Sequence, residues 1–260
     1  MKLLSFQLRS SNFLKFPAPS ILILSLVTIC GQIFTSCSKN ESTDKDQPII
    51  ETEQPIEGQI AYYPFNLNVR DTSGHQNHGQ IHGDLIFVYD RHEKPNRACY
   101  FNGVNAYVSV SHKDELNLTN EWTIACWVIP YNLKGPHIIL SKSKGAGTDG
   151  YILKDHNSTE KIRMELFNFA DLSSKTSLVI GNWTFITVTY NRDQMKIYYD
   201  GLLDNQINCS TPIVGNADDL MIGTYALMTA YREYFEGIID DVRIFNRVLN
   251  SAEINDLYHR

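Results

Sequence analysis

The clearest alternation of apolar and polar positions lies at 236–245. A β-strand places successive side chains on opposite faces, and this segment has that period of two. The two sets are Ile238, Asp240, Val242 and Ile244 on one face, and Ile239, Asp241, Arg243 and Phe245 on the other. Asp240 is therefore expected to face inward among apolar neighbours. Because a buried carboxylate needs a partner, the pattern predicts a cation beside Asp240.

A short helix is predicted directly after this strand. Asn250 and Glu253 have the spacing of a capping box, in which each side chain binds the backbone N–H of the other residue. No long helical period appears before Ser251. The last strand is therefore expected to lead into one short closing helix.

Most of the chain repeats short apolar and aromatic runs between clusters of Gly, Asn, Asp and Pro. The clearest runs are 60–65, 106–110, 122–129, 137–141, 161–167, 183–190 and 195–199. Asp200 and Gly201 follow the last of these and are a strong signal for a type I′ hairpin turn. Many short strands at regular spacing predict an all-β fold, a two-sheet antiparallel jelly-roll sandwich.

The first 36 residues have the features of a lipoprotein signal peptide. They hold three basic residues, no acidic residue and an apolar run from Ile21 that is too short to span a bilayer. Ser36 followed by Cys37 resembles a bacterial lipobox, although Phe34 stands where leucine is usual. This predicts cleavage before Cys37 and a lipid on Cys37. An ordinary secretory signal with an incidental cysteine is the alternative.

Composition separates a tether from a domain. Residues 37–58 are polar and acidic and contain Pro48 and Pro55, so they predict a flexible tether. Residues 59–260 are then one domain, long enough to bury a substantial core. The expected location is extracytoplasmic, as a membrane-anchored lipoprotein of a bacterial cell envelope.

The charge balance argues against a polyanionic partner. The chain has 23 basic and 29 acidic residues, a net charge of −6. Without the three cations of the signal peptide, the net charge is about −9, which makes nucleic acid an unsuitable ligand. Three cysteines remain in the domain, Cys99, Cys126 and Cys209. They are interpreted as buried free thiols, with a disulfide between two of them as the alternative.

Several motifs occur in an order that resembles one family. They are YPFN at 63–66, DTSGHQNHG at 71–79, ACYFNG at 98–103, YVSV at 107–110, WTIACW at 122–127, WTFITVTY at 183–190, YYDG at 198–201 and the strand and helix at 236–258. Together they resemble the bacterial laminin-G-like jellyroll domain, a concanavalin A-like lectin/glucanase sandwich. The resemblance runs from about Ile60 to Arg260 and implies that fold for the whole domain.

The loop at 71–79 is the candidate metal site. Asp71 and Asn77 offer side-chain oxygens, and Gly74 permits a turn that directs backbone oxygens inward. The family resemblance implies that this loop meets the last strand and encloses a structural Ca²⁺ with Asp240. The alternative is a loop without an ion, whose polar groups bond locally as in an Asx-turn. His75, His78 and His82 in the same region do not have a spacing that indicates zinc.

Aromatic side chains on the concave sheet are candidates for stacking on sugar rings. These candidates are Trp127, Tyr131, Tyr151, Phe167, Tyr199 and Tyr231. The alternative for each of them is burial in the core. No strand carries the closely spaced acids that a glycoside hydrolase needs, and no nucleophile motif appears.

The sequence therefore predicts a non-enzymatic binding module, held at a membrane by its lipid anchor, whose partner is a glycan. A protein surface is the second candidate partner, through adhesion or assembly. A glycoside hydrolase or lyase is a weaker alternative.

Overall fold

The structure, a computed structural model, describes residues 53–135, 137–143, 149–156, 159–166, 170–210, 213–225 and 233–260. The chain divides into two units, Met1–Ile49 and Ile50–Arg260, and every described residue belongs to the second. Cys37 and the predicted signal peptide therefore lie outside the described residues. Within the described part of the chain, no helix is long and apolar enough to cross a membrane.

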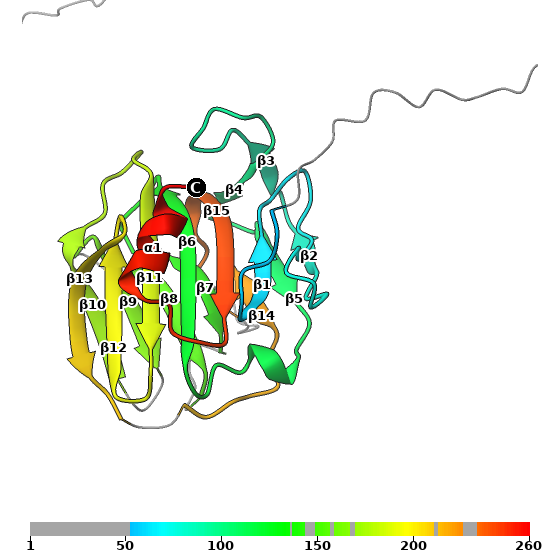
Figure 1. Cartoon of the computed structure of the whole chain (residues 1–260). Coiled ribbons are helices and arrows are strands. Elements are labelled where there is room, and N and C mark those ends of the chain that lie inside the picture. The colour runs from blue at the N-terminus through cyan, green and yellow to red at the C-terminus, as the bar shows by residue number, and fades with distance from the viewer. Residues whose placement is uncertain are drawn as a thin grey trace, which may run out of the picture. The chain divides into compact units, whose positions relative to one another are not determined.

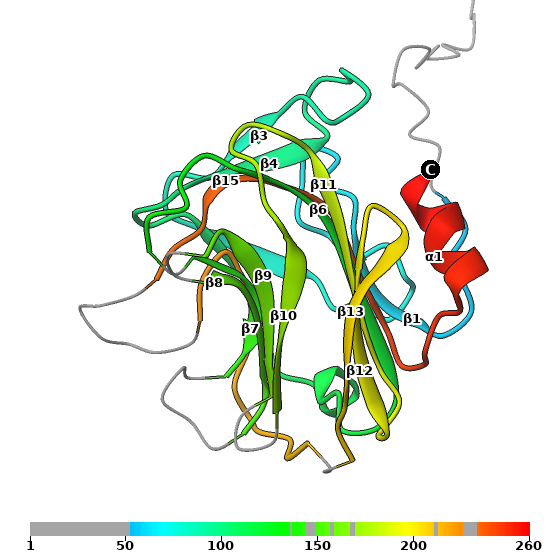
Figure 2. The same cartoon turned by 90° about the vertical axis from the view of Figure 1, so that its left-hand side faces the viewer.

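Two antiparallel sheets face each other (Figures 1 and 2). In the first sheet the strand order is β13 (Leu202–Asn208), β12 (Gln194–Tyr199), β11 (Thr184–Tyr190), β6 (Trp122–Pro130), β15 (Glu236–Phe245), β4 (Ala98–Asn102) and β3 (Ile86–Val88), and β1 (Gln59–Tyr63) also pairs with β15. In the second sheet the order is β10 (Ala170–Ser177), β9 (Lys161–Leu166), β8 (Tyr151–His156), β7 (Ile138–Lys142), β14 (Leu220–Ile222), β5 (Tyr107–Val110) and β2 (Gly79–His82). A 3₁₀ turn, η1 (Asp114–Leu116), and the helix α1 (Ser251–Tyr258) complete the domain. The predicted all-β jelly-roll sandwich is confirmed.

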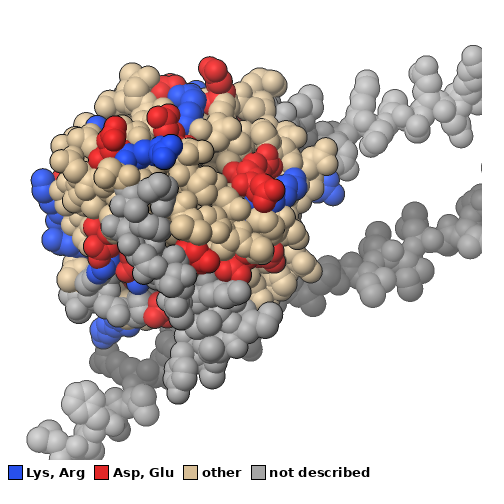
Figure 3. Space-filling view, turned by 90° about the horizontal axis from the view of Figure 1, so that it is seen from below, with Lys and Arg blue, Asp and Glu red and all other residues tan. Residues whose placement is uncertain are grey.

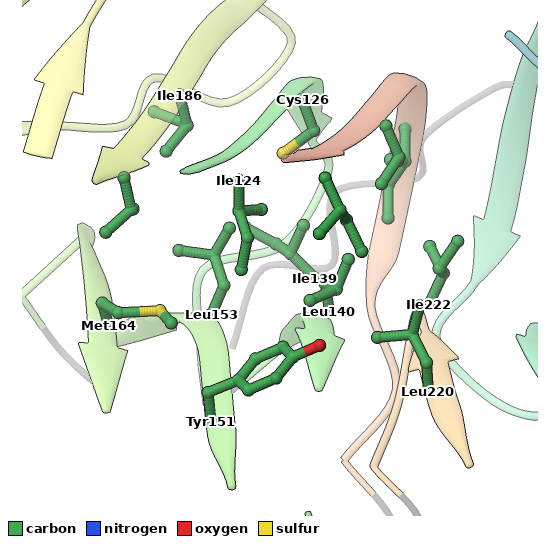
Figure 4. Close-up of a cluster of buried hydrophobic side chains, with 14 of the residues drawn as sticks. Ile124, Cys126, Ile139, Leu140, Tyr151, Leu153, Met164, Ile186, Leu220 and Ile222 are labelled. Atoms are coloured by element: carbon green, nitrogen blue, oxygen red, sulfur yellow. The ribbon is translucent and has the colours of Figure 1, made fainter. Parts of the chain in front are cut away.

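The core lies between the sheets because alternate residues of each strand point inward. In β9, Ile162, Met164 and Leu166 are buried while the intervening side chains are partly exposed. Figure 4 shows side chains of both sheets meeting in this layer, among them Ile124 and Cys126 of β6. Cys99, Cys126 and Cys209 are all buried free thiols, as predicted, and burial raises the pKa of Cys126 to about 12.

Strand β6 is buried on both faces, which alternation alone does not explain. Ile124, Cys126 and Val128 belong to the core between the sheets. Ala125 and Trp127 point to the other side, where they pack in a second cluster that includes residues of α1. Figure 2 shows α1 lying against the outside of the first sheet. The helix thus gives this sheet a covered outer face.

The cap of α1 forms as predicted. Asn250 Oδ1 accepts hydrogen bonds from the backbone N–H groups of Ala252 at 2.9 Å and Glu253 at 3.0 Å. Glu253 Oε2 in return accepts the backbone N–H of Asn250 at 2.7 Å. Ile254 and Leu257 then face the outer cluster on the first sheet. The predicted hairpin turn is also present, since Asp200 and Gly201 join β12 to β13 with φ of 49° and 79°.

The alternation predicted for β15 is wrong at one point. The pairing of β15 with β6 shifts register between Asp240 and Arg243, and Asp241 has a φ of 47°. This bulge inserts one residue and so changes which side chains face inward. Ile239, not Ile238, joins Val242 and Ile244 in the main core. Asp240 is therefore not in line with the inward residues but on the side of the sheet that carries Trp127, its partner in β6.

The folded part begins earlier than the predicted boundary at residue 59. Ile56 packs on the outer cluster, and the backbone N–H of Asn246 donates to Gly58 O at 2.9 Å. Glu53 forms an ion pair with Arg243 at 2.6 Å. The last residues of the predicted tether therefore belong to the domain surface.

Candidate functional site

The candidate site is a cavity of about 390 Å³ outside the first sheet. Its walls come mainly from β1 and the turn after it, the connection between β3 and β4, and the bulge of β15, and Glu53 before β1 and Arg260 after α1 complete them. The lining residues are Glu53, Tyr62, Pro64, Asn66, Asn68, Arg70, Thr72, Asp90, Arg91, His92, Lys94, Arg97, Asp240, Asp241 and Arg260. A cavity of this volume is in the range of small-molecule sites.

Arg91 forms the floor of the cavity. Its guanidinium lies 4.8 Å from the centre of the Trp127 ring, which is a cation–π contact. Nη1 donates to Asp241 Oδ2 at 2.7 Å and to Asp240 Oδ2 at 3.3 Å. Nη2 donates to the main-chain oxygen of Arg260 at 2.9 Å. The cation that the sequence predicts beside Asp240 is therefore this arginine.

A second arginine supports the cluster from the side of β1. Arg243 is 3 % exposed, and its guanidinium lies 3.7 Å from the centre of the Tyr62 ring. It pairs with Glu53 at 2.6 Å and approaches Asp241 at 3.8 Å. The Tyr62 hydroxyl donates to Asp241 Oδ1 at 2.6 Å, so each oxygen of Asp241 has a short hydrogen bond.

The two neighbouring carboxylates have opposite pKa shifts. Burial and the adjacent charge of Asp241 raise the pKa of Asp240 well above its ordinary value, and Arg91 offsets this only in part. Burial also acts to raise the pKa of Asp241, but Arg243, Arg91 and the Tyr62 hydroxyl outweigh it and lower that pKa. Asp241 is thus the carboxylate that the arginines hold in its charged form.

Sequence reasoning did not identify Arg91 or its basic neighbours. Asp90 to Arg97 contains Arg91, His92, Lys94 and Arg97, which is a local density of basic residues in an acidic chain. That density was the available signal, and averaging charge over the whole chain concealed it. The face of the molecule in Figure 3 carries basic and acidic side chains interspersed between uncharged areas.

Two of the predicted aromatic candidates, Trp127 and Tyr151, are buried rather than open to a ligand. Trp127 is 8 % exposed, because Tyr258 of α1 stacks on it with ring centres 5.5 Å apart and Arg91 covers it as well. Tyr151 is 1 % exposed in the core and donates its hydroxyl hydrogen to Leu116 O at 3.1 Å (Figure 4). Its prediction as a stacking residue is wrong, since a core side chain cannot reach a ligand.

Of the remaining aromatic candidates, the structure describes Tyr199 and Tyr131. Tyr199 is half-buried, and its hydroxyl donates to Ser177 O at 2.9 Å. Tyr131 is 44 % exposed and packs against Tyr100 with ring centres 5.8 Å apart. Phe167 and Tyr231 lie outside the described residues. Tyr131 is therefore the described candidate that is open to solvent.

The residues predicted to bind calcium do not fit a common shell. Asp71 Oδ1 accepts the backbone N–H groups of Tyr62 and Ser73, and Oδ2 accepts the Ser73 hydroxyl and the backbone N–H of Asn77, all at 2.8–2.9 Å. Asp71 and Asn77 do meet, but through the hydrogen bond from the Asn77 backbone N–H to Asp71 Oδ2. The pairing of Asp240 with Arg91 removes the reason for an ion there.

Few ligand atoms remain in the loop itself. Asn77 Oδ1 is buried without a hydrogen-bond partner, and Gly74 turns with a φ of 96° at an open position. Calcium takes six to eight oxygen ligands, so one unpaired oxygen does not make a site. Among the described residues, no group of three or more His, Cys, Asp or Glu side chains has a metal-binding arrangement. The loop has the locally bonded Asx-turn form that was the alternative.

Residues 86–255 match the Laminin_G_3 family model, described as the concanavalin A-like lectin/glucanases superfamily. The match covers more than half of the chain, and the chain belongs to this superfamily. No curated protein matches the sequence.

Solved structures share this fold at low sequence identity. Domain 4 of AbnA, an extracellular GH43 arabinanase from Geobacillus stearothermophilus solved with arabinotriose, has a TM-score of 0.61 at 18% identity, covering 77% of this chain and 98% of that one. The receptor-binding domain of the botulinum neurotoxin C/D mosaic serotype has a TM-score of 0.62 at 19% identity, covering 78% of this chain and 51% of that one. A botulinum neurotoxin DC binding domain solved with rat synaptotagmin II gives 0.61 at 16% identity, with 78% and 51% covered. This chain thus spans about half the length of the toxin domains.

The burial of Trp127 leads to a prediction about stability. Trp127→Ala removes a ring that packs against α1 and Arg91, so it is expected to lower the free energy of unfolding by about 3–5 kcal/mol. Tyr131→Ala is the matched change at an exposed aromatic and is expected to cost less than about 1 kcal/mol. Urea denaturation followed by circular dichroism measures both. Equal small losses would show that Trp127 is not part of the packed structure.

The Asp71 contacts lead to a prediction about calcium. Melting temperatures with EDTA and with excess Ca²⁺ are expected to agree within about 1 °C, whereas a site saturated at a hundred times its Kd adds about 2.7 kcal/mol, or roughly 5–10 °C in a domain of this size. Asp71→Asn should still destabilise the protein by about 1.5–3 kcal/mol, because its amide nitrogen opposes a backbone donor. A calcium-dependent rise in melting temperature that Asp240→Asn removes would instead establish the site predicted from the sequence.

Proposed function

We propose that this protein is a carbohydrate-binding module that holds a glycan in the cavity above Arg91 and does not cleave it. The observation that carries the proposal is the cavity itself, whose floor of arginines and carboxylates is fixed by mutual contacts while its rim keeps polar groups available. Arg91, Arg243, Asp240 and Asp241 all have partners among the described residues. A rigid, polar floor orients a ligand at little cost in ordering.

The cavity wall that follows β1 supplies groups that a sugar needs. Pro64 gives apolar surface, and the Thr72 hydroxyl and the Asn66 amide lie in the same wall. Sugar hydroxyls bind such amides and hydroxyls, and the apolar face of a sugar ring packs on surfaces of this kind. The arabinotriose in the AbnA domain supports a glycan as the ligand class, although that similarity concerns the fold.

The acidic pair in the floor favours binding over hydrolysis in this proposal. A glycoside hydrolase needs two carboxylates that flank the scissile bond, one of them free to donate a proton. Asp240 and Asp241 are adjacent in the chain and share one nitrogen of Arg91. Held side by side on one guanidinium, they do not flank a bond from opposite sides, and Asp241 acts as the counter-charge to the arginines.

A protein partner is the second candidate, and one observation favours it. Leu67 and Tyr89 are each 64% exposed, and each directly adjoins residues of the cavity wall. Exposed apolar side chains around a polar cavity are typical of protein contacts. A glycan held in the cavity does not need Leu67 and Tyr89, whereas a protein partner that covers this surface does, so the two candidates differ in whether these side chains matter for binding.

Location is the second part of the proposal. Ser36 and Cys37 at lipobox positions, after a short apolar run, support an extracytoplasmic lipoprotein of a bacterial envelope. In such a protein the acidic segment after Cys37 is a tether that holds the domain near the membrane surface.

The glycan proposal predicts retention without turnover. The full-length protein, extracted in detergent, should be retarded in affinity gels that contain its polysaccharide, and it should release no new reducing ends or unsaturated products. Arg91→Met should reduce retardation, since it disrupts the cavity floor, while Leu67→Ser with Tyr89→Ser should leave it unchanged. Cleavage that Asp240→Asn abolishes would establish an enzyme, and loss of binding in the Leu67 and Tyr89 variant would favour a protein partner.

The location proposal predicts the fate of Cys37. Cys37→Ala should move the protein from the membrane fraction to the soluble fraction or stall its processing, because the lipid chains are attached through Cys37. Firm attachment needs several such chains, since one acyl chain binds a membrane only marginally. Cys30→Ala is the matched control, because Cys30 follows the bulky Ile29 inside the predicted signal peptide, and it should leave the membrane fraction unchanged. Mass spectrometry of a mature N-terminus that is unmodified and away from Cys37 would contradict the anchor.

A further inference from the structure

The cavity above Arg91 has more basic groups than its own acidic groups neutralise. Its lining contains five basic side chains, Arg70, Arg91, Lys94, Arg97 and Arg260, against four acidic ones, Glu53, Asp90, Asp240 and Asp241. The cavity is thus locally positive in a chain whose net charge is −6. A local excess of this sign attracts anions even when the whole protein is acidic.

Each acidic group of the lining already has a partner. Arg91 contacts both Asp240 and Asp241. Glu53 pairs with Arg243 at 2.6 Å and also with Arg260. Burial acts to raise the pKa of Glu53, but these two arginines outweigh it and lower that pKa, so Glu53 stays charged beside them.

Asp90 is satisfied in a different way, by its own loop. Its Oδ1 accepts the backbone N–H groups of His92 at 2.9 Å and Lys94 at 2.8 Å. This Asx-type arrangement shapes the connection between β3 and β4 and directs it over the cavity.

Three cations of the same lining have no such partner. Among the residues that the structure describes, the side chains of Arg70, Lys94 and Arg97 form no ion pair and no hydrogen bond, and only backbone groups of these residues are engaged. Arg70 lies after β1 and the other two lie between β3 and β4. They therefore approach the cavity from separate segments.

We infer that Arg70, Lys94 and Arg97 bind the anionic group of an acidic sugar, a carboxylate or a sulfate, that enters this cavity. Arginine matches both groups with paired N–H donors, and lysine adds a compact charge. The inference rests on the proposed glycan-binding function and names its ligand class. It differs from a polyanion-binding surface, because the excess is confined to one cavity and the rest of the chain is acidic.

The competing explanation is that three surface cations are simply solvated. It predicts that their removal changes nothing beyond the general charge of the protein. A matched pair of triple variants separates the two. The rim variant removes the three cations at the rim of the cavity by Arg70→Gln, Lys94→Gln and Arg97→Gln. The control variant removes the same charge from exposed positions outside the cavity by Lys134→Gln, Lys175→Gln and Arg192→Gln.

The ligands are also used in matched pairs. Trigalacturonic acid is paired with its carboxyl-reduced form, sialyllactose with lactose, and a chondroitin sulfate tetrasaccharide with its desulfated form. Heparin serves as a dense polyanion. Calorimetry with the full-length protein in detergent measures each affinity, and melting curves check that both triple variants fold.

At least one acidic member is expected to bind about tenfold or more tightly than its neutral partner, since one charge-assisted hydrogen bond is worth that factor. The rim variant should lower the affinity for that acidic ligand by about a hundredfold and the affinity for its neutral partner by less than about threefold. The control variant should change neither affinity. Comparison of the carboxylate and sulfate pairs shows which anion is preferred. Heparin should not bind more tightly than the best oligosaccharide.

Three results would overturn the inference in distinguishable ways. If neutral glycans bind as well as acidic ones and the rim variant is unaffected, the acidic ligand class is wrong while the glycan-binding proposal stands. If no glycan of either kind binds, both fail. Equal weakening by the two triple variants would show a general charge effect and would also overturn the rim assignment.

Discussion

The contact of Arg91 with Asp240, Asp241 and Trp127 is the interaction on which the outer side of the first sheet depends. Two consecutive carboxylates at a bulge are costly to bury, and the nearest basic group comes from a different part of the chain. Arg91 brings the β3–β4 connection onto β15, and its flat face covers the Trp127 ring of β6. Its remaining bond, to the main chain of Arg260, joins the segment after α1 to the same point. Four separate parts of the domain thus meet at one guanidinium.

This arrangement also divides the charges of the cavity into two groups. The floor consists of charges that satisfy one another, with Glu53 and Arg243 extending the cluster toward β1. The rim consists of Arg70, Lys94 and Arg97, which the described chain leaves without side-chain partners. Because the floor is already neutralised, an added carboxylate or sulfate meets the rim cations alone. Binding at such a site uses preorganised groups and avoids the cost of ordering them.

Much of the fold follows from local patterns in the sequence. The apolar run that forms β9, the Asp200 and Gly201 turn, and the capping box at Asn250 each depend on neighbours within a few residues, and all are present as predicted. The bulge in β15 was not predictable in this way. A single inserted residue shifts the alternation, and the sequence does not show where pairing with β6 will slip. An aspartate tolerates the left-handed backbone conformation that Asp241 has, but the presence of an aspartate does not predict that conformation.

The site was predicted less well because it depends on distant contacts. Asp240 has the cation that its burial requires, but this cation is the side chain of an arginine 149 residues away, which no local pattern indicates. Trp127 was a candidate for an exposed sugar-binding aromatic, but α1 and Arg91, both distant in the sequence, cover it. Net charge likewise averages over the chain and conceals the basic segment from Asp90 to Arg97.

The central claim, that Arg91 neutralises the buried carboxylates of the bulge, is tested most directly by a double-mutant cycle between Arg91 and Asp241. Arg91→Met keeps the packing on Trp127, and Asp241→Asn keeps a residue that tolerates the left-handed backbone. The free energies of unfolding should give a coupling of at least about 2 kcal/mol, against less than about 1 kcal/mol for the partly exposed pair Arg247 and Glu253. Additive effects of the two changes, within about 0.5 kcal/mol, would contradict the claim.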